Sequence, residues 1–227
     1  MMNLQDAMAL LEAAGTPQNR QIYSRHGVQG DCFGVSFADL NKLKKAIKVD
    51  HELAQELWAT GNHDAQVLAT MIADAKGTQE PLVDAWVKEL GNHMIADAFA
   101  SFVSQTPFAR KKVTEWTCSQ EEWVGRAGWH LLAILLKDSA ALSETELEAC
   151  LTRIEADIHT SKNRVKEAMN SALMAIGIYR EALRDKALRA AGRIGKVEVD
   201  HGETNCKTPD AATYIQKAVA RQRARSG

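Results

Sequence analysis

The chain has 227 residues, of which 45% are hydrophobic and 25% charged, and its formal net charge at pH 7 is −1. This length is enough for one large domain or two small ones with a sizeable core. No apolar run reaches the roughly 18 residues that span a membrane, and the N-terminus lacks a signal-peptide pattern. The four cysteines are scattered, so we expect free thiols in a reduced, cytoplasmic protein.

The net charge hides an uneven distribution along the chain. Residues 1–100 contain 8 Lys and Arg against 13 Asp and Glu, a balance of −5, whereas residues 101–227 contain 20 against 16, a balance of +4. A protein with such polarity can bind a polyanion on one face although its total charge is near zero. Solvated helices often show the same asymmetry, so it does not identify a partner by itself.

Helical periodicity runs through nearly the whole chain. The first amphipathic helix begins at Leu4 and ends at Gly15, a loop covers 31–35, and Ser36 is expected to cap the helix that follows it. An irregular loop at 193–209 precedes the last helix, and the only candidate strand is 196–199. The other predicted helices cover about 18–26, 38–48, 50–60, 63–75, 80–90, 93–104, 108–116, 120–137, 143–158, 162–178, 179–191 and 209–223.

Three local patterns support this assignment. Ser119 and Glu122 have the spacing of a capping box. The tripeptide Gly-Asn-His occurs at 61–63 and again at 91–93, where Gly can end one helix and Asn can cap the next. One stripe of the helix after Ser161 is apolar at helical spacing, and its members are Val165, Ala168, Met169, Ala172, Leu173 and Ile176.

The repeated Gly-Asn-His and the recurring Ala/Leu-rich second helices indicate a helix-pair repeat of about 30 to 40 residues. We therefore predict an all-α fold, an α-solenoid or superhelix of antiparallel helix pairs with roughly 11 to 13 helices. The whole chain, 1–227, is expected to form a single domain. A generic helical bundle is the structural alternative.

Many signatures of enzymes are absent: the sequence has no Walker A loop, GxGxxG, GxSxG or HExxH motif. We expect no nucleotide cofactor, no other cofactor and no metal. The loop from Asp200 to Cys206 also contains His201 and Glu203, which are metal-ligand residue types, but their spacing matches no known zinc pattern. A loop held by local hydrogen bonds that caps the last helix is the expected alternative.

Four motifs follow one another between about residues 30 and 180. They are CFGVSFADLNKLK at 32–44, ELW at 56–58 with HDAQVLA at 63–69, EWVGRAG at 122–128 and VKEAMNSALMAIG at 165–177. In this order they resemble the DNA alkylation repair (AlkD-like) family. The family's corresponding motifs are FGV followed by LRK, ELW followed by HEARLLA, EWVRRAG, and VKKAVNWALRQIG.

The resemblance implies a solenoid of HEAT-like repeats whose concave basic face holds double-stranded DNA. Active members of the family hydrolyse the N-glycosidic bond of cationic N3- or N7-alkylated purines without flipping the base. A carboxylate beside the sugar can stabilise the oxocarbenium-like transition state and orient water. By alignment, Asp97 is the candidate catalytic carboxylate, and Arg126 is the candidate phosphate-binding arginine. The resemblance also implies a bacterial protein, nucleoid-associated when on DNA, and we expect a monomer.

The sequence departs from the family at several site positions. His93 and Ser171 align with two tryptophans that grip the damaged nucleotide, and neither offers the same aromatic face to a cationic purine. One arginine of the family's WVRR motif is replaced by Gly125. Trp129 is the tryptophan that could substitute for a missing aromatic side chain. Three cations at a helix start are further candidates for phosphate binding: Lys162, Arg164 and Lys166.

Each of these residues also has a structural explanation. His93 and Asp97 can form a simple pair one turn apart, worth about 0.2–0.5 kcal/mol, and Arg126 can form a surface ion pair with Glu122. Three functions therefore stay open. The first is a DNA-binding protein of the glycosylase family with Asp97 as the carboxylate, the second is a non-catalytic binder of distorted or branched DNA, and the third is a HEAT-like protein-interaction scaffold.

Overall fold

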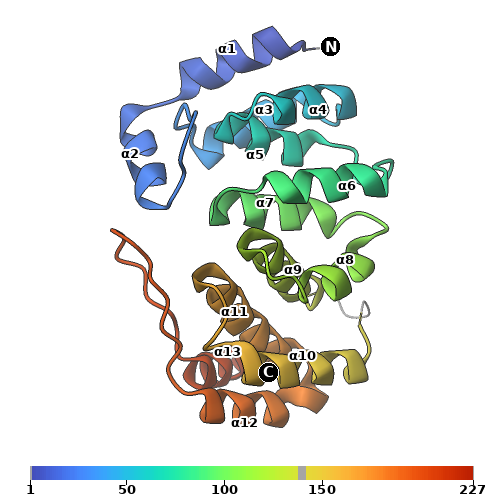
Figure 1. Cartoon of the computed structure of the whole chain (residues 1–227), viewed down its shortest axis with the longest axis vertical. Helices are drawn as coiled ribbons and strands as arrows, with labels where there is room; N and C mark the ends of the chain where they lie inside the picture. Colours follow the sequence, from blue (N-terminus) through green and yellow to red (C-terminus); the bar gives the residue numbers. More distant parts are fainter. Residues whose placement is uncertain (1, 138–141, 227) are drawn as a thin grey trace. The chain divides into compact units, whose positions relative to one another are not determined.

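The computed structural model describes residues 2–137 and 142–226, and in these residues the fold is all-α (Figure 1). They form thirteen α-helices and two short 3-10 helices, and no strand occurs among them apart from an isolated bridge between Gly15 and Val35. The predicted all-α class and the predicted number of helices are confirmed. No helix in the described residues has both the length and the apolar character of a membrane span.

The chain divides into two compact units. The first unit contains Met1–Phe108 and Gly202–Thr204, and the second contains Ala109–His201 and Asn205–Gly227. The assignment of 1–227 to one domain stays a prediction.

The first unit is built from helix pairs joined by short loops. Helix α4 packs on α5, and α5 also packs on α3 and α7. Figure 1 shows α3, α4 and α5 lying side by side in this unit. Three residues connect α4 to α5, so the two helices run antiparallel. The elements are α1 (Leu4–Ala14), α2 (Pro17–Arg25), α3 (Phe37–Ile47), α4 (His51–Ala59), α5 (His63–Ile72), α6 (Glu80–Trp86), η1 (Val87–Glu89) and α7 (His93–Val103).

The two Gly-Asn-His tripeptides start helices as predicted. The Asn62 side chain accepts hydrogen bonds from the backbone N–H groups of the second and third residues of α5, and Asn92 does the same for α7. Both asparagines are buried, so each cap satisfies donors that water does not reach. The repeat visible in the sequence is therefore a repeat of helix starts.

A buried carboxylate fixes the loop that carries the FGV motif. The Asp64 side chain is fully buried and accepts hydrogen bonds from the backbone N–H groups of Phe33, Gly34 and Val35, at 2.7–3.0 Å. Gly34 has a φ of 79°, and a Cβ there would lie 2.6 Å from the carbonyl oxygen of Thr16. Glycine is therefore required at this position, and the motif has a structural role.

In the second unit α11 is the central helix, and it packs on α9, α10, α12 and α13. Helix α8 also packs on α9, and the two approach closely because a Cβ at Gly128 would lie 2.7 Å from the backbone nitrogen of Thr117. The predicted apolar stripe of α11 is buried. The elements are α8 (Ala109–Trp116), α9 (Glu122–Leu135), α10 (Glu144–Asp157), α11 (Asn163–Tyr179), η2 (Glu181–Leu183), α12 (Arg184–Ile194) and α13 (Ala211–Ser226).

The capping box predicted at Ser119 and Glu122 is wrong. Helix α9 begins at Glu122, its N-cap Glu121 makes no side-chain cap bond, and the Ser119 hydroxyl instead accepts from the Glu121 N–H. The Glu122 carboxylate instead accepts a hydrogen bond from the backbone N–H of Arg164 in α11. The capping box of this unit lies at the start of α10, between Ser143 and Glu146.

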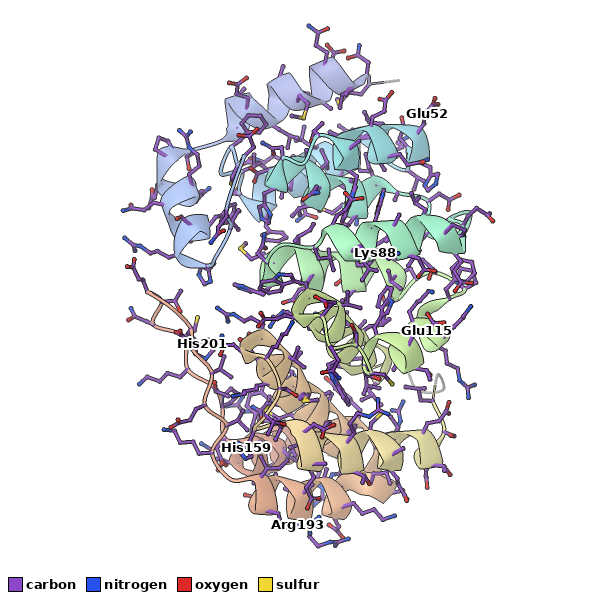
Figure 2. The ribbon with its side chains drawn as sticks, in the orientation of Figure 1. Glu52, Lys88, Glu115, His159, Arg193 and His201 are labelled. Atoms are coloured by element: carbon purple, nitrogen blue, oxygen red, sulfur yellow. The ribbon has the colours of Figure 1, made fainter. Side chains whose placement is uncertain are left out.

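The irregular segment after α12 is held by side chains of α11. Asn163 donates to the carbonyl oxygen of Asp200 at 2.7 Å and accepts from its N–H at 2.8 Å, while Asn170 donates to the carbonyl oxygen of Pro209 at 3.0 Å. His201, labelled in Figure 2, lies on this segment, and its Nε2 is 3.0 Å from the Thr208 hydroxyl. No strand forms at the predicted 196–199 position among these described residues.

Candidate functional site

Asp97 lies in the second turn of α7, one turn after His93 at the first helical position. Both side chains are half-buried, and the backbone carbonyl oxygen of Asp97 accepts a hydrogen bond from the Ser101 hydroxyl at 2.9 Å. The imidazole rings of His93 and His26 are 5.6 Å apart between centroids. The first unit therefore holds the predicted carboxylate one helical turn after His93, at which the resemblance to the family implies a tryptophan.

Arg126 is buried in the second unit. Its side chain is only 6% exposed, and Nη1 donates to Oε2 of Glu167 at 2.6 Å and to the carbonyl oxygen of Arg164 at 3.3 Å. Arg164 donates to the same Glu167 oxygen at 3.0 Å. The alternative explanation of Arg126, a surface ion pair with Glu122, is wrong, because Arg126 is buried and binds Glu167 of α11.

One carboxylate, that of Glu167, binds two guanidinium groups in this cluster. Burial alone would raise the pKa of Glu167, but Arg126 and Arg164 outweigh burial, and the net direction of the pKa is down. Glu167 is therefore ionised at neutral pH and binds both guanidinium groups. A guanidinium that is buried and already paired gains little by turning to a phosphate. In this structure Arg126 connects α9 to α11.

The start of α11 carries the three other predicted phosphate-binding residues. The backbone N–H of Arg164 donates to Oε1 of Glu122 at 2.7 Å, so a carboxylate already satisfies one free N–H of this helix start. Lys166 lies close enough to Glu198 to lower the pKa of that carboxyl, after the larger effect of Lys196. Lys162, the N-cap residue, is exposed and forms no ion pair with any described residue.

Ser171 and Gly125 lie on α11 and α9 of the same unit. The Ser171 hydroxyl donates to the carbonyl oxygen of Glu167 at 3.0 Å, as a serine inside a helix often does. Gly125 is buried, and a Cβ there would lie 3.2 Å from Val165 and 3.3 Å from the carbonyl oxygen of Ser119. Neighbouring atoms therefore occupy the space that a side chain would need at this position, where the family carries an arginine.

Trp129 cannot replace the missing aromatic face as this structure stands. Its side chain is 0% exposed, and its indole N–H has no hydrogen-bond partner among the described residues. Of the five tryptophans in the chain, Trp123 alone is half-buried and the others are buried. Trp123 lies on α9 three residues before Arg126, and no sequence pattern distinguishes it from the four buried tryptophans.

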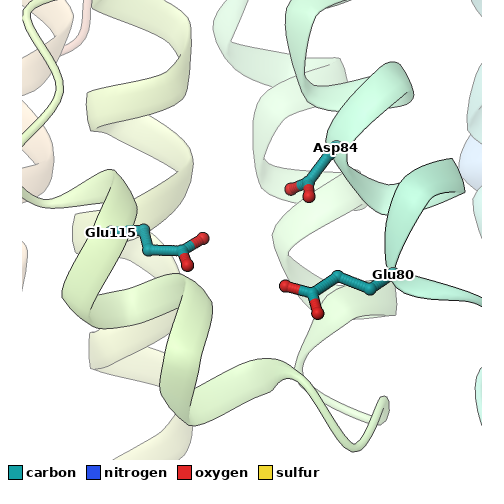
Figure 3. A group of neighbouring side chains, drawn as sticks. All are labelled: Glu80, Asp84 and Glu115. Atoms are coloured by element: carbon teal, nitrogen blue, oxygen red, sulfur yellow. The ribbon is translucent and has the colours of Figure 1, made fainter.

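Figure 3 shows three carboxylates, and we assign no metal to them. Glu80 and Asp84 lie on α6 of the first unit, and Glu115 lies on α8 of the second. Within the second unit, Glu115 already accepts a hydrogen bond from the buried ammonium group of Lys112 at 2.8 Å. The nearby ring of Trp116, 6.0 Å from Lys112 Nζ, adds a favourable contact for that cation.

Comparisons with known proteins agree with the motifs. The family model for the DNA alkylation repair enzyme matches residues 7–215. Uncharacterized protein Lin0241 of Listeria innocua is 30% identical over 215 residues, which cover 92% of this chain and 93% of that protein. Uncharacterized protein Lmo0209 of Listeria monocytogenes is 29% identical with the same coverage.

One solved structure is also similar along nearly the full length. It has a TM-score of 0.91 and 33% sequence identity, and the match covers 98% of this chain and 96% of the other. That structure is described as a new family of proteins related to the HEAT-like repeat DNA glycosylases, with affinity for branched DNA structures. The predicted fold class, HEAT-like antiparallel helix pairs, is confirmed by this match.

Proposed function

Because the chain belongs to the DNA alkylation repair enzyme family, we propose that it binds double-stranded DNA and prefers branched or distorted duplexes to linear ones. The similarity to the solved structure described as having affinity for branched DNA carries this proposal. The altered positions support it, because His93 and Ser171 supply no broad aromatic grip for a single damaged base. A protein that recognises DNA by shape and charge does not need that grip.

The second unit offers cations for this role. Lys162 is exposed and without an ion-pair partner among the described residues, and Lys166 lies one turn further along α11. Residues 101–227 also have a positive charge balance, +4. Arg126 acts in this proposal by positioning α11 against α9, since Glu167 holds its guanidinium.

The test is a binding titration of the full chain with a labelled three-way junction and with a linear duplex of the same arm sequence. We expect the junction to bind at least about tenfold more tightly, which is about 1.4 kcal/mol. The double variant Lys162→Glu, Lys166→Glu should weaken binding to both DNAs and reduce the salt slope by about 0.9 per lost phosphate contact. Lys186→Glu, on α12, is the matched control.

Two results would contradict the proposal. Equal affinity for junction and linear duplex would remove the preference for branched DNA. No binding to either DNA at low salt would favour a HEAT-like protein-interaction scaffold instead.

Excision of cationic N3- or N7-alkylated purines is a second candidate function, favoured by the carboxylate that the chain retains at Asp97. The electron pair of the N-glycosidic bond would pass to the cationic base, which leaves as a neutral purine. Water would then add to C1′ of the sugar and release a proton. The half-buried Asp97 carboxylate would stabilise the developing cation.

Base release from duplexes that contain N7-methylguanine or N3-methyladenine tests this candidate. This candidate function would be established if the wild-type chain releases the base faster than the spontaneous rate and the Asp97→Asn variant does not. Release at the spontaneous rate, or release unchanged by Asp97→Asn, would leave DNA binding as the function.

A further inference from the structure

The first unit also contains a pocket that the predicted site residues do not line. Its volume is about 450 Å³, within the range of about 300–1,000 Å³ typical of ligand sites. Side chains from α3, α5 and α7 line it, together with the segments that follow α3 and α5. Neither His93 nor Asp97 lines it, although Ser101, whose hydroxyl donates to the carbonyl oxygen of Asp97, does.

The pocket presents an unusual amount of apolar surface to solvent. Phe37, the first residue of α3, is 50% exposed, and Val49, two residues after α3, is 68% exposed. Both line the pocket, whose floor includes the buried Phe102 of α7. An exposed aromatic ring at the mouth of a pocket is a surface on which a planar ligand can stack.

Two lysines line the same pocket. Lys44 lies seven residues after Phe37 and so shares its face of α3, and Lys76 lies on the loop after α5. Both are exposed and form no ion pair with any described residue. The one acidic residue of the lining, Asp74, accepts a hydrogen bond from the backbone N–H of Lys76 at 3.1 Å. The lining is therefore net positive, in a stretch of chain whose overall balance is negative.

We propose that this pocket binds an unpaired nucleotide of a single-stranded DNA arm, with the base stacked on Phe37 and the adjacent phosphates bound by Lys44 and Lys76. Aromatic rings beside cations are the usual means by which proteins bind single strands without sequence preference. The proposal rests on the proposed function, and it names the part of a branched DNA that this face contacts.

A flap DNA, which is a duplex with one single-stranded arm, tests the proposal against the same duplex without the arm. Phe37→Ala should weaken binding to the flap at least about fivefold, the lower end for one stacked base, and should leave binding to the linear duplex unchanged. The double variant Lys44→Glu, Lys76→Glu should also lose flap affinity selectively and reduce the salt slope by about 0.7 per lost contact.

Two matched controls come from the same unit. Lys42→Glu reverses the charge of one lysine on the other side of α3, where Lys42 pairs with Asp39 at 2.7 Å. Ile22→Ala truncates an exposed apolar side chain on α2. Both controls should bind flap DNA like the wild type.

The outcomes separate this proposal from the proposed function. If the wild type binds flap and linear DNA but the pocket variants keep the wild-type ratio of affinities, the pocket assignment is overturned and the proposed function stands. If the wild type binds no DNA at low salt, the proposed function fails, and the pocket assignment fails with it. An equal loss for both DNAs would also overturn the assignment to an unpaired nucleotide.

Discussion

Replacing Glu167 by Gln removes the carboxylate that binds two arginines of the second unit. The Arg126 side chain is 6% exposed and Glu167 is 26% exposed, so neither charge is well hydrated. Two unit charges about 4 Å apart interact by about 4 kcal/mol at an effective dielectric constant of about 20. Loss of one partner of a buried pair usually costs about 3–5 kcal/mol. Because Gln can still accept one hydrogen bond from Arg126, we expect a loss of about 3 kcal/mol.

Urea unfolding at pH 7, followed by circular dichroism, measures this change in the free energy of unfolding. Glu148→Gln is the matched control, because its partner is Lys186 and both side chains are more than 40% exposed. The control should cost less than about 1 kcal/mol. The double variant Arg126→Met, Glu167→Gln should recover part of the loss, because it also removes the guanidinium that Glu167 binds.

The double-variant cycle also gives the coupling energy between Arg126 and Glu167, which we expect to be at least about 1 kcal/mol. A Glu167→Gln variant whose free energy of unfolding lies within about 0.5 kcal/mol of the wild type would contradict a stabilising role for this ion pair. It would mean that Glu167 does not hold Arg126 in solution.

Three further predictions test the structural account. Ser143→Ala should cost about 1 kcal/mol in thermal or urea unfolding, because it removes the capping box of α10, and Ser119→Ala should cost less. Gly128→Ala should destabilise by about 1–3 kcal/mol through its clash with the α8 backbone, whereas Gly192→Ala, where a Cβ meets nothing within 4 Å, should stabilise by about 0.5–1 kcal/mol. Because the folded pKa of Glu167 lies below its ordinary value of 4.5, its stabilisation is present above that pH and lost as the pH falls through the folded pKa. The difference between wild type and Glu167→Gln should therefore be largest at pH 7 and shrink below about pH 4.5 in urea titrations.

Features set by neighbouring residues could be predicted from the sequence. Asn62 and Asn92 cap helices because an amide side chain there reaches N–H groups only two and three residues away. The apolar stripe of α11 is equally local, since helical spacing alone places its members on one side. The order of the family motifs then gave the fold class that the solved structure confirms.

Features set by distant partners could not be predicted in this way. Glu167 is 41 residues from Arg126 in sequence, whereas Glu122 is one helical turn away. Local spacing therefore favours Glu122 as the partner of Arg126, and only the packing of α9 on α11 brings Glu167 to it. In the same packing the Glu122 carboxylate accepts a hydrogen bond from the backbone N–H of Arg164, so it does not form the predicted capping box. Phe37 lies in the 32–44 motif, but the sequence did not indicate that its ring is exposed, because burial at a helix start depends on how distant elements pack.

The most direct test of the account is a competition experiment. The wild-type chain is first bound to a labelled three-way junction at about 100 mM salt and is then displaced by unlabelled junction or by unlabelled linear duplex of the same arm sequence. The account predicts that displacement needs at least about tenfold more linear duplex than junction. Displacement at equal concentrations of the two DNAs would contradict the claim that this chain selects branched DNA.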